Sequence, residues 1–70
     1  MYHRKRKGKG FTYQYENGST IKDEKIRHWI KSLIIPPAWK EVEIEENKKA
    51  DLLVTGRDDK NRKQYIYHPN

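Results

Sequence analysis

Apolar residues recur at helical spacing in one segment of the chain. After Asp23, a candidate N-cap whose carboxylate can accept from free backbone N–H groups, they fall at positions i, i+3, i+4 and i+7, namely at Ile26, Trp29, Ile30 and Leu33. Pro36 and Pro37 end the pattern, because proline donates no backbone hydrogen bond and disfavours the α conformation in the residue before it. The pattern predicts one amphipathic helix between Asp23 and Pro36.

Apolar and polar residues alternate with period two in other segments, which predicts strands. In Phe11–Tyr15 three aromatic residues share one face, which we assign to the core, and Asn17-Gly18 suits a tight hairpin turn before a return strand from Thr20. Val42 and Ile44 alternate with glutamates, which is typical of a half-buried strand with an acidic outer face.

Two more strands are predicted towards the C-terminal end. Leu52–Thr55 is followed by a turn over Gly56–Asn61 and a last strand over Arg62–His68. Together the patterns predict a single α+β domain: a small antiparallel sheet of about five strands with one or two short helices packed on it, the second being a helical turn near Trp39.

Composition limits the possible functions of the chain. The 70 residues, 33% of them hydrophobic, support one domain with a thin core, and the absence of cysteine excludes disulfides and thiolate metal sites. No apolar run approaches the ~20 residues of a membrane span, so we expect a cytoplasmic protein with no membrane partner. The net charge of +6 favours a polyanionic partner.

Charge is unevenly distributed along the chain. Residues 1–15 carry five cationic side chains and no acid, whereas residues 41–54 carry five acids against two lysines, a net charge of −3. Residues 1–10 are therefore expected to be a flexible basic arm ahead of a folded domain over residues 11–70. We also expect a basic side and an acidic side, with the outer face of the glutamate-rich strand turned away from a polyanionic partner such as a nucleic acid.

The last predicted strand carries the candidate binding residues. If Ile66 points into the core, then Lys63, Tyr65 and Tyr67 lie on the other face, where two phenol rings and a cation could contact phosphate, sugar or base. Alternatively, both tyrosines pack on a neighbouring strand or the helix. The Gln64 amide can pair with adenine, and the nearby Arg57 and Arg62 can bind guanine or phosphate. Residues of these types are also common on any protein surface.

No constellation of side chains suggests catalysis. The three histidines are far apart in the sequence, no acidic cluster completes a metal-ligand set, and no phosphate-binding loop or nucleophile motif is present. The sequence therefore predicts no catalytic residue, no metal and no cofactor.

An ordered series of motifs runs from about Arg4 to Pro69. It comprises Gly10-Phe11-Thr12-Tyr13, Asn17-Gly18, Ile35-Pro36-Pro37-Ala38-Trp39, Thr55-Gly56-Arg57-Asp58 and Arg62-Lys63-Gln64-Tyr65-Ile66-Tyr67-His68. In this order and spacing the motifs resemble the amino-terminal domain of bacterial and poxvirus type IB DNA topoisomerases. Two residues depart from the family pattern: Asn61 stands where glycine is frequent, and Glu43 where bacterial members often carry tryptophan.

The resemblance implies a function beyond what composition supports. Family members clamp duplex DNA between two lobes, and a carboxy-terminal catalytic domain, which would follow residue 70, nicks and religates one strand to relax supercoils without ATP or metal. The family's major-groove contacts fall on Gln64, Tyr65 and Tyr67. We therefore expect a monomeric lobe that binds double-stranded DNA in the bacterial nucleoid and cooperates with the catalytic domain of the same polypeptide.

Two other functions remain open from the residues alone. One is a β module that binds RNA or single-stranded DNA, with Tyr65 and Tyr67 as stacking platforms. The other is a domain that docks other proteins through its acidic strand and basic segment and binds no nucleic acid.

Overall fold

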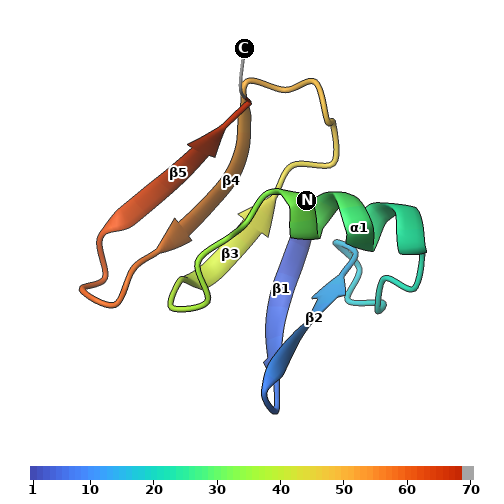
Figure 1. The fold of residues 1–70 in the computed structure, drawn as a ribbon, viewed down its shortest axis with the longest axis horizontal. Helices are drawn as coiled ribbons and strands as arrows, with labels where there is room; N and C mark the ends of the chain where they lie inside the picture. Colours follow the sequence, from blue (N-terminus) through green and yellow to red (C-terminus); the bar gives the residue numbers. More distant parts are fainter. Residues whose placement is uncertain (69–70) are drawn as a thin grey trace.

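A computed structural model describes residues 1–68 and shows a five-stranded antiparallel sheet with one helix against one of its faces (Figure 1). The elements in chain order are β1 (Tyr2–Lys7), β2 (Gly10–Gln14), α1 (Glu24–Ser32), β3 (Lys40–Ile44), β4 (Leu52–Arg57) and β5 (Lys63–Tyr67). In space the strands follow the order β2-β1-β3-β4-β5. The predicted small α+β fold is thereby confirmed.

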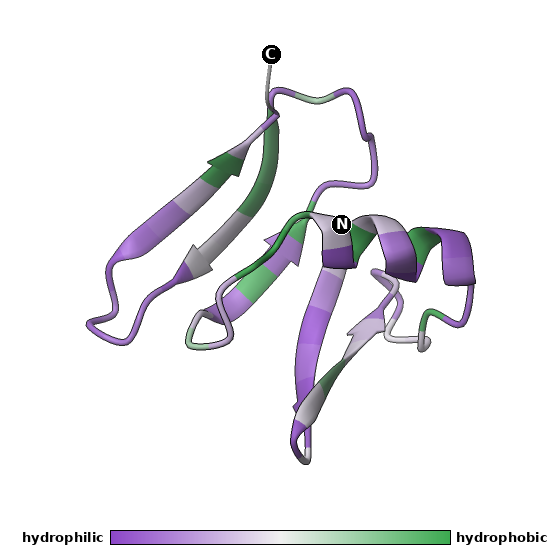
Figure 2. Ribbon diagram, viewed as in Figure 1, coloured by the Kyte–Doolittle hydropathy of each residue, from purple (hydrophilic) through white to green (hydrophobic). Residues whose placement is uncertain are grey.

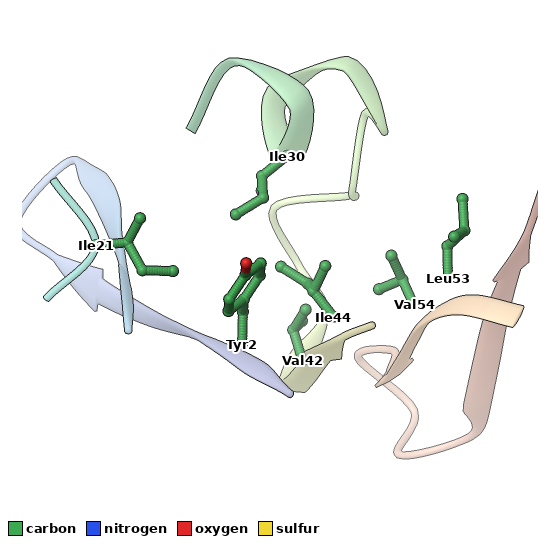
Figure 3. Packing of buried hydrophobic residues seen from close by; sticks show 7 residues of the cluster. All are labelled: Tyr2, Ile21, Ile30, Val42, Ile44, Leu53 and Val54. Carbon is green, nitrogen blue, oxygen red and sulfur yellow. The ribbon is translucent and has the colours of Figure 1, made fainter. Parts of the chain in front are cut away.

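The helix forms where the periodicity predicts it. The Asp23 side chain caps it by accepting from the Lys25 backbone N–H at 2.9 Å, and Ile30, only 1% exposed, packs from α1 onto the sheet (Figure 3). Near Trp39 the structure has a turn, closed by a hydrogen bond from the Trp39 N–H to the Pro36 carbonyl, and not the second helical turn that we expected.

The core lies between α1 and the central strands. It consists of seven buried residues from β1, α1, β3, β4 and the segment before α1: Tyr2, Ile21, Ile30, Val42, Ile44, Leu53 and Val54 (Figure 3). Tyr13 of β2 and Tyr15, which follows that strand, are half-buried and pack against this core, as predicted. Phe11 is also half-buried, but its ring lies beneath the guanidinium of Arg4 at 4.1 Å.

The expectation of a flexible arm is wrong for residues 2–7. They form β1, which pairs with β2 on one side and β3 on the other, and Tyr2 is buried in the core. β1 is mostly hydrophilic (Figure 2), so its composition does not indicate a strand. Its even-numbered residues nevertheless turn towards the core side of the sheet and its odd-numbered residues turn away. Consequently β2 pairs with β1, and the predicted return strand contributes only a single bridge, between Gln14 and Thr20.

Candidate nucleic-acid interface

One face of the sheet is left uncovered by α1, and we call it the open face. Residues paired across neighbouring strands lie on the same face, so the register aligns His3, Glu43, Thr55 and Tyr65 in one row. Lys5 and Lys7 extend this face over β1, and Arg57 and Lys63 extend it over β4 and β5.

The tyrosines of β5 are exposed at this face. Tyr65 is 46% exposed and Tyr67 is 61% exposed, and their ring centroids are 6.2 Å apart with a tilt of 31°. The Lys63 ammonium lies 5.8 Å from the centre of the Tyr65 ring. Ile66 is half-buried against the core. Of the two interpretations left open by the sequence, the structure supports the exposed one.

Gln64 lies on the other face of β5. It pairs with Gly56 of β4, a residue packed beneath the Trp39 ring, and its side-chain amide donates to the Asp58 carboxylate at 3.0 Å. Gln64 and the two tyrosines therefore meet only along the outer edge of β5. Within residues 1–68 no strand pairs with that edge.

Both candidate arginines make ion pairs within the domain. The Arg57 Nε donates to Glu41 Oε2 at 3.1 Å, and the Arg62 Nε donates to Asp58 Oδ2 at 3.1 Å. The four residues are not equally exposed, since Asp58 is largely covered and the other three are open to water. Exposed ion pairs contribute little net stability, so a phosphate could replace Glu41 as the partner of Arg57 at small cost.

The expected separation of acidic and basic sides is wrong. β3 lies between β1 and β4, so Glu43 sits in the same row of the open face as His3 and Tyr65. Glu41, at a bulge with a φ of 51°, joins it beside Arg57. The middle of the open face is therefore acidic, with cations on the strands that flank it.

Sequence reasoning missed the role of two arginines in β1. The Arg4 guanidinium donates to the carbonyls of Pro36 at 3.0 Å and Trp39 at 2.9 Å, with a longer contact to Ile35 at 3.4 Å. Arg6 reaches the Pro37 carbonyl at 3.4 Å. Burial lowers the pKa of Arg4, but a guanidinium stays charged at neutral pH. These arginines hold the Ile35–Trp39 loop through contacts between residues distant in the sequence, and no local pattern indicated them.

Asp58 is a third residue whose role sequence reasoning missed. Its carboxylate accepts from the backbone N–H groups of Lys60 and Arg62, each at 2.9 Å, and from the side chains of Arg62 and Gln64. These donors, the Arg62 backbone first, hold the pKa of Asp58 below its ordinary value. The same turn places Asn61 at a φ of 63°, as expected for a residue that replaces glycine. Asp58 thus organises the connection between β4 and β5.

Residues 1–68 contain no group of three His, Asp or Glu side chains that could hold a metal ion. In the same part of the chain no helix has the length and apolar character needed to cross a membrane.

The fold and its open β5 edge define a small α+β module with a basic, tyrosine-bearing edge strand. Residues 10–58 match the family described as the N-terminal domain of bacterial DNA topoisomerase IB. This match spans well over half of the chain, and the chain belongs to that family. Arg57 lies within the matched segment, whereas the candidate residues of β5 follow it. Neither a curated protein nor a solved structure matches the chain.

Proposed function

We propose that this domain binds duplex DNA through the outer edge of β5, as the non-catalytic lobe of a type IB topoisomerase. The observation that carries the proposal is the exposed Tyr65–Tyr67 pair with Lys63 beside it on an edge strand. A phenol can donate to a phosphate or a base edge, its ring can lie against a sugar, and the ammonium neutralises phosphate charge.

The position of the acids favours the strand edge over the whole open face. A duplex lying flat across the sheet would bring its phosphates over Glu43 and Glu41, which is electrostatically unfavourable. An approach along β5 avoids both and lets Gln64 and the tyrosines reach the same groove from opposite faces of one strand. The major groove, roughly 12 Å wide, admits a two-stranded ribbon such as β4–β5.

Within the whole protein this lobe would hold and position DNA while a separate catalytic domain of the same polypeptide nicks and religates one strand. We place this activity in the cytoplasm, on the nucleoid, and expect a monomeric protein without metal or cofactor. The residues that would hold DNA in this way are two phenols, an amide and the cations of β4, β5 and their turn.

An amide-resolved titration with a short duplex and with a single strand of the same sequence tests this proposal. The duplex should shift Arg57 and residues 63–67, the shifts should weaken as salt rises, and α1 should stay unchanged. Stronger binding of the single strand would favour the stacking module instead. Absence of any nucleic-acid binding would favour protein docking.

A matched pair of charge variants sharpens the test. Lys63→Gln removes a cation beside the tyrosines, whereas Lys31→Gln removes one from the last turn of α1, on the other side of the sheet. Loss of one phosphate contact should lower the dependence of log Kd on log salt by about one unit in Lys63→Gln alone. Equal effects of the two substitutions would reduce the interaction to nonspecific attraction by net charge.

A further inference from the structure

The turn between β4 and β5 joins Asp58 to a candidate base-reading side chain. We propose that Asp58 is a positioning residue that fixes the orientation of the Gln64 amide and thereby sets which base pair the β5 edge prefers. The inference rests on the proposed function, because it concerns the specificity of the same DNA contact.

The Asp58 carboxylate is held firmly enough for this role. Oδ1 accepts from the backbone N–H groups of Lys60 and Arg62, both at 2.9 Å, which fixes the carboxylate to the turn. Oδ2 accepts from Arg62 Nε at 3.1 Å and from Gln64 Nε2 at 3.0 Å. The Asp58 side chain is only 13% exposed, so water competes weakly for these donors.

The chemistry of the two groups determines the orientation of the amide. An ionised carboxylate can only accept hydrogen bonds, whereas the glutamine amide has one accepting and one donating end. The Gln64 NH2 group must therefore face Asp58, because a flipped amide would set its carbonyl oxygen against Oδ2. The oxygen and the second N–H of the amide are then left for a partner.

That free edge of the amide has a defined complement in DNA. An acceptor beside a donor matches the N6 amino group and the N7 of adenine in the major groove, whereas guanine presents two acceptors there. An amide fixed in this orientation favours A·T over G·C at the contacted position. An amide free to rotate about its last bond loses part of that preference.

Asp58→Asn is the informative substitution. The Asn oxygen can still accept from the Lys60 and Arg62 backbone and preserve the turn, but its NH2 group takes the place of Oδ2 and no longer requires the Gln64 amide to donate. Arg62→Gln is the matched control, since it removes the other side-chain donor to Oδ2 and leaves the contact with Gln64 intact.

The experiment measures the Kd of each protein for a panel of duplexes, in each of which one A·T pair is replaced by G·C. The proteins are the wild-type domain, Asp58→Asn, Arg62→Gln, Gln64→Ala and the Asp58→Asn/Gln64→Ala double variant. At one position the wild-type domain should prefer A·T by on the order of tenfold. Asp58→Asn should reduce this ratio several-fold without weakening overall binding, because it removes a negative charge. Arg62→Gln should keep the ratio, and Asp58→Asn should have no further effect on it once Gln64 is absent.

A measurement without DNA tests the orientation of the Gln64 amide separately from the base preference that we derive from it. The two side-chain N–H protons of Gln64 should have widely separated NMR shifts in the wild-type domain and shifts typical of a free amide in Asp58→Asn. Duplex binding with no preference at any position, or with a ratio that Asp58→Asn leaves unchanged, overturns the inference and leaves the proposed function standing. No duplex binding by the wild-type domain overturns both.

Discussion

Arg4 should behave as a structural cation rather than as a DNA ligand, and Arg4→Lys tests this directly. The substitution keeps the charge but replaces the fork of the guanidinium, which donates to the Pro36 and Trp39 carbonyls at 3.0 and 2.9 Å. Hydrogen bonds that involve a charged group contribute about 1.5–3 kcal/mol each, and an ammonium can restore one of the two. We therefore expect a loss of about 1.5–3 kcal/mol, the contribution of the one bond that is not restored.

A loss of this size is large for a chain of 70 residues, whose total stability is expected to be about 4–10 kcal/mol. It corresponds to a fall in Tm of roughly 10–20 °C, measurable by circular dichroism. Lys5→Gln is the control, because Lys5 is exposed and points to the other face of β1. It should leave Tm nearly unchanged. The interpretation is refuted if Arg4→Lys melts like the wild-type domain, and more so if it weakens DNA binding at constant Tm.

Three further predictions follow from packing, exposure and ionisation. Gly56→Ala should lower the stability by about 1–3 kcal/mol in urea unfolding, because the added Cβ would lie 2.9 Å from Trp39 Cε3; unchanged stability would show that the Trp39 ring yields freely. Tyr65→Ala should weaken duplex binding at least about fivefold in fluorescence titrations while the fold persists, and an unchanged Kd would remove Tyr65 from the interface. The pKa of Asp58 is lowered in the folded state, so its ionisation stabilises the domain above the ordinary aspartate pKa and this contribution is lost as pH falls through the lower folded value. Unfolding measured between pH 6 and pH 2 should thus show a smaller acid-induced loss in Asp58→Asn than in the wild-type domain, and parallel curves would contradict it.

Local sequence patterns predicted the helix and strands in which the spacing of apolar residues indicates which side faces the core. The spacing of Ile26, Trp29, Ile30 and Leu33 defined α1, and Asp23 defined its start. The alternation in residues 63–67 correctly placed the two tyrosines on an exposed face, because Ile66 packs against the core and its two neighbours in the strand then point to the other side.

The features that sequence reasoning missed depend on residues distant in the chain. Arg4 is a structural residue only because the Ile35–Trp39 loop returns its carbonyls to β1, and no local pattern announces that contact. Glu43 shares a face with Tyr65 because β3 lies between β1 and β4, and strand order is a property of the whole sheet. The cationic composition of residues 1–10 favoured a solvated arm, whereas Tyr2 is buried in the core and β1 pairs with both β2 and β3.

A spin label in the major groove tests most directly whether the β5 edge binds duplex DNA. A nitroxide on the C5 position of a central thymine should broaden the amide signals of residues 63–67 most strongly, those of Arg57 less, and those of α1 least. A label in the minor groove of the same duplex should broaden none of them to that extent. Broadening centred on β1 and β2 or on α1, or equal broadening by both labels, would contradict the account.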